Sequence, residues 1–133
     1  MGTVRSSITV SSGDVLATAV NITSSKSIAA DSGVVLRAKV RGVAAGDAIT
    51  VYKADDKTTS AYLYVKNMDP ELENYLYLIN TTDSNGAVAK IGGGEFCFIP
   101  VFVSKTYKVY GTLVDQMVEY LVFGQDNPAN TLG

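Results

Sequence analysis

The sequence contains no histidine and only one cysteine, Cys97. A single cysteine excludes an intrachain disulfide and a cysteine-based zinc site. Without histidine, a serine or cysteine nucleophile lacks its usual base. Cys97 stands in the apolar string FCFIPVFV, so we interpret it as a small buried hydrophobic residue. We therefore expect no catalytic residue, no cofactor and no metal ion, and hence a protein that is not an enzyme.

Charge is also scarce, because only 18 % of the residues are charged, against about 25 % in an average soluble domain. The 11 basic residues are scattered rather than clustered, which disfavours binding to nucleic acid. No apolar run approaches the roughly 20 residues that cross a membrane, and the start has no signal-peptide pattern. We expect a chain that is made in the cytoplasm without membrane contact, with a low-charge surface suited to packing against neighbours.

What the sequence does contain is alternation of apolar and polar residues with period two, interrupted by turn residues. At 133 residues the chain has the size of one domain. The pattern predicts an all-β fold, an antiparallel β-sandwich or jelly-roll-like barrel of about 8–10 short strands with little or no helix. Strands are expected at residues 7–10, 15–23, 34–43, 48–54, 59–67, 73–82, 87–91, 95–103, 106–113 and 117–124.

The sequence divides into three segments that differ in composition. Residues 1–30 are rich in Ser, Thr and Ala, and we interpret them as an edge strand or an arm that reaches outside the compact body. Residues 31–124 are expected to form the sandwich, and residues 125–133 a loose polar tail. Within the body, only Asp69–Asn74 suggests a helical turn.

The stretch KIGGGEFCFIP raises the question of a phosphate-binding loop at Gly92, Gly93 and Gly94. Such a loop requires a helix directly after the glycines, whereas the residues that follow are β-branched and aromatic. We therefore predict a sharp bend or bulge that leads into a strand. Asn85-Gly86 is the strongest hairpin-turn signal, and DSNG lacks the downstream acidic ligand of a calcium loop.

Two pairs of carboxylates are possible acid–base groups, Asp55 with Asp56 and Glu71 with Glu73. Both pairs fall in turn regions, next to Lys57 or near a proline. We interpret them as solvated loop charges rather than as the paired carboxylates of a glycosidase. In the same regions, Asp55-Asp56-Lys57 is expected to form an exposed turn.

Four tyrosines are the candidate interface residues: Tyr62 and Tyr64 on one expected strand, and Tyr75 and Tyr77 on the next. If those strands pair, the four rings line one face of a sheet. Aromatic rings on a sheet can stack on sugars or anchor a protein partner. Ordinary cross-strand packing is the plainer explanation of these residues, because tyrosine favours strands in any case.

Both faces of the strand after the glycines are apolar. Phe96, Phe98, Pro100 and Phe102 alternate with Cys97, Ile99, Val101 and Val103. This predicts burial on both sides, either in the centre of the sandwich or under a neighbouring subunit. Pro100 in addition indicates an edge strand or a bulge.

Several segments of the second half, SAYLYVKNMD, GGGEFCFIPVFV, YKVYG and VEYLVFG, resemble small all-β virion proteins of tailed double-stranded DNA bacteriophages. The resemblance covers about residues 60–124 and does not extend to the first 45. It implies a capsid decoration (cement) protein that binds the major capsid protein on the virion surface, as a homo-oligomer and most typically a trimer. A component of the tail or fibre, or a glycan-binding module, is the alternative.

Overall fold

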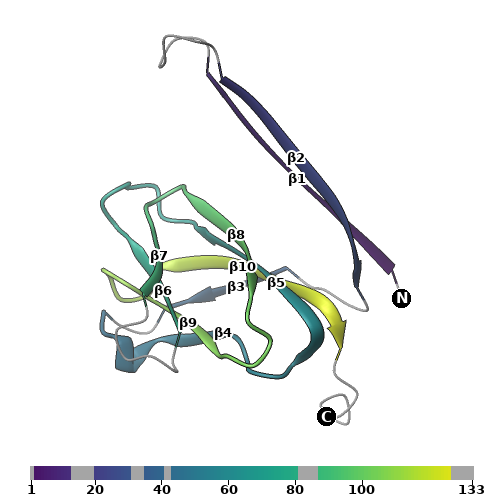
Figure 1. Ribbon diagram of the computed structural model, residues 1–133. Helices are drawn as coiled ribbons and strands as arrows, with labels where there is room; N and C mark the ends of the chain where they lie inside the picture. The colour runs from purple at the N-terminus through teal and green to yellow at the C-terminus, as the bar shows by residue number, and fades with distance from the viewer. Residues whose placement is uncertain (1, 13–19, 31–34, 41–42, 81–86, 127–133) are drawn as a thin grey trace.

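The computed structural model describes residues 2–12, 20–30, 35–40, 43–80 and 87–126 (Figure 1). The described residues are almost entirely β-structure, with a single turn of 3-10 helix, η1 (Ala45–Asp47). The strands are β1 (Gly2–Ser12), β2 (Val20–Ala30), β3 (Leu36–Lys39), β4 (Ile49–Tyr52), β5 (Lys57–Asn67), β6 (Leu76–Asn80), β7 (Ala87–Ile91), β8 (Phe96–Val101), β9 (Tyr107–Gly111) and β10 (Met117–Asp126).

The body consists of two four-stranded sheets with the strand orders β3-β10-β5-β8 and β4-β9-β6-β7. All pairs within them are antiparallel, and the sheets pack face to face. The predicted antiparallel sandwich is therefore confirmed, and the described strands form no closed barrel. Below, the two sheets are called the β5 sheet and the β6 sheet.

The core lies between the two sheets and follows from the alternation along the strands. On β5, Leu63 and Val65 are fully buried, whereas Tyr62 and Tyr64 point to the opposite face. Leu76 and Leu78 of β6 meet the β5 side chains from the other sheet. Burial of each such leucine contributes about 1.5–3 kcal/mol, so these inward positions fix the register of both sheets.

β1 and β2 form a separate two-stranded antiparallel sheet, which we call the arm. β1 and β2 pair without interruption from Gly2↔Ala30 to Ser12↔Val20. Figure 1 shows the arm (purple and dark blue) beside the sandwich and extending past it. β2 extends beyond the strand expected at residues 15–23: Ser24 and Ser25 pair within the arm with Ile8 and Ser7. Cross-strand pairing lets serine and threonine continue a strand.

The glycine triplet lies in the turn between β7 and β8, packed against the loop that follows β5. The Gly92 carbonyl accepts a hydrogen bond from the Glu95 N–H at 2.9 Å, and Gly94 has φ +81°. A Cβ on Gly93 would lie 2.1 Å from the Glu71 carbonyl oxygen, so only glycine permits this close approach of two backbones. Asn85 and Gly86 lie outside the described residues.

The loop after β5 is held by a buried amide, the side chain of Asn67. Its Nδ2 donates to the carbonyl oxygens of Asn74 at 2.7 Å and Ile91 at 2.9 Å, and its Oδ1 accepts from the Asp69 N–H at 3.0 Å. Gln116 Nε2 donates to the same Oδ1 at 3.3 Å. The expected helical turn at Asp69–Asn74 is absent, because Asp69 and Asn67 direct this backbone into turns instead.

Two boundaries differ from the sequence prediction at the far end of the body. Lys57 is not part of an exposed turn: it begins β5, is buried, and forms an ion pair with Asp126. β10 accordingly continues past Gly124, through an irregularity in its pairing with β5, to Asp126. The described chain therefore remains in the sheet for two residues where a loose tail was expected, because a buried ammonium group requires a charged partner.

Candidate interaction surface

An aromatic layer covers the outer face of the β5 sheet. It consists of five rings from three neighbouring strands, Tyr62, Tyr64, Phe96, Phe98 and Phe123. The register brings them together, because Tyr64 pairs with Phe98 and Tyr62 pairs with Phe123. Ring centroids lie 5.4 Å apart for Tyr62 and Phe123 and 5.7 Å apart for Phe98 and Phe123. These separations are typical of favourable aromatic pairs.

Within the described residues, the arm packs against this aromatic layer near its base. Ile28 and Ala30 of β2 are buried against Phe123. Val4 of β1 packs against the same cluster, together with Tyr62 and Leu121 of the sheet. Farther along β1, 50 % of Ile8 and 51 % of Val10 are accessible to solvent.

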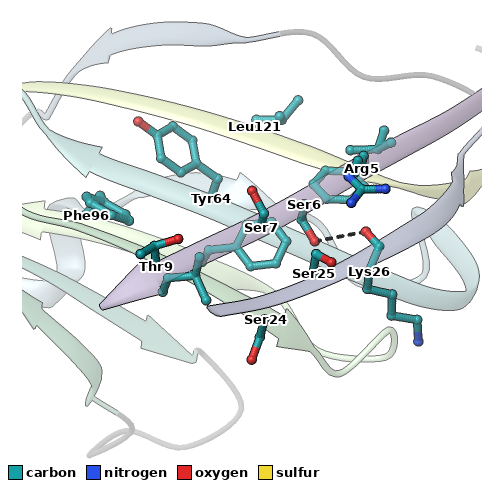
Figure 2. A pocket seen from close by; sticks show the side chains of 14 residues that line it. Arg5, Ser6, Ser7, Thr9, Ser24, Ser25, Lys26, Tyr64, Phe96 and Leu121 are labelled. Carbon is teal, nitrogen blue, oxygen red and sulfur yellow. Dashed lines mark hydrogen bonds between the residues drawn. The ribbon is translucent and has the colours of Figure 1, made fainter. Parts of the chain in front are cut away.

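A groove of about 720 Å³ separates the rest of the arm from the aromatic layer. Its floor is apolar and consists of Tyr64, Phe96, Phe98, Leu121 and Phe123. The arm provides the opposite wall through residues 4–9 and 24–26, several of which are serines and a threonine. Figure 2 shows these small hydroxyl side chains along the two arm strands, with the Ser6 Oγ donating to the Lys26 carbonyl oxygen at 3.4 Å.

One end of the groove carries a small polar network. Tyr64 donates its hydroxyl to Glu119 Oε1 at 3.1 Å, and Arg37 Nε donates to Glu119 Oε2 at 3.0 Å. The Arg37 guanidinium, assisted by the Tyr64 hydroxyl, lowers the pKa of the Glu119 carboxyl below its ordinary value. Burial, together with the bond to Glu119, raises the pKa of the Tyr64 hydroxyl. The tyrosine is therefore held as a neutral donor that fixes one ring of the groove floor.

The four candidate tyrosines do not share one surface. β5 and β6 lie in different sheets, so the pairing that would have aligned the rings does not occur. Tyr62 and Tyr64 belong to the aromatic layer beneath the arm. Tyr77 lies on the outer face of the β6 sheet, where it stacks on Tyr110 at 5.1 Å, and Tyr75 lies under the Lys90 ammonium at 4.0 Å.

The strand β8 is not buried on both sides within the sandwich. It is an edge strand, as Pro100 indicated. Cys97 is half-buried and packs against the core, where burial raises the pKa of its thiol. The opposite face is open, with 58 % of Phe96, 36 % of Phe98 and 65 % of Phe102 exposed. Of the two alternatives for this strand, the position in the sandwich centre is wrong.

Comparison of the chain with protein-family models, with curated proteins and with solved structures finds no match. Within the described residues, no group of three or more Cys, Asp or Glu side chains is arranged to hold a metal ion. The same part of the chain has no helix with the length and apolarity needed to cross a membrane.

Only part of this surface could be predicted from the sequence. The alternation placed Phe96 and Phe98 on one strand face, but not beside Tyr62 and Tyr64, because that juxtaposition depends on the pairing of β5 with β8. The role of Phe123 and of the arm base was missed altogether. The sequence feature that could have indicated the arm base is the set of apolar residues at alternate positions in the arm, among them Val4, Ile8 and Ile28.

Proposed function

We propose that the chain is a non-enzymatic structural protein of a tailed-phage virion, a decoration (cement) protein that binds the outside of the head. The observation that supports this most directly is the amount of apolar surface left uncovered on one small domain. Phe96 and Phe98 of the aromatic layer are exposed, and so are Ile8 and Val10 of the arm. Exposed apolar patches of this kind mark protein–protein contacts. The resemblance of residues 60–124 to phage virion proteins suggests that the partner is a capsid protein.

In this role the chain works by adding contact area. The partner is the major capsid protein, and the location is the capsid surface. A rigid sandwich that spans the seam between capsid subunits stabilises the head against the pressure of its DNA. Many copies in a symmetric array make a modest contact effective, because each neighbour raises the local concentration of the next. No nucleic acid, membrane, metal ion or cofactor takes part.

Rebinding to stripped heads tests this role. Purified protein is added to phage heads from which the decoration protein has been removed, and the temperature of DNA release is measured. We expect saturable binding and a higher release temperature. Heads that retain their own decoration protein are the control and should bind no more. Absence of saturable binding, or recovery of the protein only in tail fractions, contradicts the proposal.

A glycan-binding module is the second candidate, and the stacked pair of Tyr77 and Tyr110 favours it. Both rings are partly exposed on the outer face of the β6 sheet, beside the Lys90–Tyr75 contact. Exposed aromatic faces of this kind can stack on a sugar ring. This function requires saturable binding to a cell-surface polysaccharide that is lost in Tyr77→Ala/Tyr110→Ala and kept in Tyr62→Ala/Tyr64→Ala. A glycan array without signal would remove it.

A further inference from the structure

The arm carries an apolar face that its own chain covers only in part. Val4, Ile8 and Val10 occupy alternate positions of β1, and Ile28 pairs directly with Val4 on β2. Val4 and Ile28 pack against the body, whereas Ile8 and Val10 remain half-exposed. A hairpin of two strands is at best marginally stable alone in water. The distal half of the arm therefore requires a surface to cover its apolar side.

The matching surface is present on the same chain. The groove floor exposes Phe96 and Phe98, next to the part of the aromatic layer where the arm base already packs. The contact of Ile28 and Ala30 with Phe123 shows that this face of the arm and this face of the sheet are complementary. The uncovered groove floor is a continuation of that contact.

The connection to the body explains why a chain does not fill its own groove. Only five residues separate Ala30, at the end of β2, from Leu36, at the start of β3. They span at most about 20 Å, and Leu36 is fixed by its pairing with Tyr120. The base of the arm is thereby held beside β10, and the distal half stands away from the rings. An arm from another copy is free of this constraint.

Charge favours the same arrangement. The two strands of the arm carry Arg5 and Lys26 and no acidic residue. With Asp14 between the two strands, residues 2–30 carry a net charge of +1, and because the whole chain has a net charge of −2, the remaining residues carry a net charge of −3. These opposite signs favour association of the arm of one copy with the body of another.

We propose that copies of this chain exchange arms, so that the arm of one copy lies in the aromatic groove of a neighbouring copy. Ile8 and Val10 then cover Phe96 and Phe98 of the neighbour. Exchange of an identical element is a low-cost route to a homo-oligomer, and here it extends to a second copy the kind of contact that the arm base makes with Phe123 of its own chain. The exchange is a property of the purified chain and does not depend on the proposed role on the capsid.

The first test measures the mass of the assembly in solution by light scattering over a range of concentrations. The wild-type chain should associate, and Ile8→Asp/Val10→Asp should raise the dissociation constant at least about 100-fold, because two carboxylates would be buried against rings. Ser11→Asp/Thr23→Asp is the matched control. It adds the same charge to the same half of the arm, at exposed positions of the other face, and should behave like the wild type.

A wild-type chain that is monomeric at all concentrations would overturn the proposal, as would equal weakening by both double variants. Circular dichroism of each variant verifies that the sandwich is intact. The test does not involve phage heads. A chain that self-associates but does not rebind heads would refute the capsid role alone, and the reverse result would refute arm exchange alone.

The second test identifies which chain provides the arm. In a Cys97→Ser background, Ile8→Cys and Phe98→Cys place one thiol on the arm and one on the groove floor. Under mild oxidation, arm exchange predicts a covalent dimer or larger species on a non-reducing gel. Phe98→Cys alone is the control for chance collisions and should give far less. A disulfide within a single chain, or no disulfide at all, contradicts the exchange.

Discussion

Replacement of Asn67 by alanine should destabilise the sandwich far more than its polar character suggests. The side chain is completely buried. It donates to the carbonyl oxygens of Asn74 and Ile91, and it accepts from the Asp69 N–H and from Gln116 Nε2. At about 1 kcal/mol for each hydrogen bond, the substitution removes about 4 kcal/mol. Domains of this kind have total stabilities of about 5–15 kcal/mol.

Urea denaturation followed by circular dichroism measures this loss. Asp69→Ala is the matched control in the same loop, because Asp69 Oδ1 also accepts two hydrogen bonds, from the Glu71 N–H and from Asn74 Nδ2. Asp69 is only partly buried, so water can replace these bonds and the cost should be about 1 kcal/mol. Equal effects of Asn67→Ala and Asp69→Ala would refute the reasoning.

A further variant separates hydrogen bonding from packing at the same position. Asn67→Asp preserves the shape of the side chain, but an ionised carboxylate cannot donate to the two carbonyl oxygens. We expect a loss at neutral pH at least as large as that of Asn67→Ala, since a charge is also buried. Lowering the pH should recover part of the stability, because the protonated acid regains one donor. A pH-independent loss would contradict this explanation.

Three other outcomes follow from single groups. Gly93→Ala should destabilise the folded chain by about 1–3 kcal/mol, since the added Cβ would lie 2.1 Å from a backbone oxygen. Gly46→Ala is the control, because a Cβ there meets open space, and equal denaturation midpoints of the two variants would contradict this. Arg37 and Tyr64 lower the pKa of Glu119 from its ordinary 4.5. The ionised Glu119 therefore stabilises the folded chain fully above pH 4.5, and this stabilisation is lost as the pH falls through the lowered pKa. The stability difference between the wild type and Glu119→Gln should shrink from about pH 7 to about pH 3, and a constant difference would exclude the effect. Cys97, whose pKa is raised by burial, should react with a thiol reagent slowly until the protein unfolds, and rapid labelling of the folded chain would show that the thiol is accessible.

The sandwich could be predicted from the sequence because its strands are half-buried. In β5, inward Ala61, Leu63 and Val65 alternate with outward tyrosines, and this period-two pattern is independent of what the strand pairs with. The inward position of Asn67 continues the same alternation. A polar residue at a core position of an otherwise regular strand was therefore a readable signal of a buried hydrogen-bonding centre.

The candidate surface could be predicted only in part, because it depends on which strands are neighbours. Tyr62 and Tyr64 are adjacent to Tyr75 and Tyr77 along the chain, but the loop after β5 passes from one sheet to the other. The true neighbours of Tyr64 are Phe98 and Leu121, which are 34 and 57 residues away in the sequence. Alternation assigns a residue to a face and says nothing of such distant pairing.

The apolar residues of this chain fall into two groups, those that pack in the core of the sandwich and those that remain exposed to another surface. The core is closed by aliphatic side chains such as Leu63, Leu76 and Leu78, which are fully buried. The large rings Phe96 and Phe98 lie outside it, on an edge strand where they do not pack in the core, and the arm adds further apolar side chains beyond the sandwich. Rings exposed in this way gain stability only when another surface covers them. The outer face of the β5 sheet is therefore best explained as one half of a contact, and the arm provides a surface of matching chemistry for the other half.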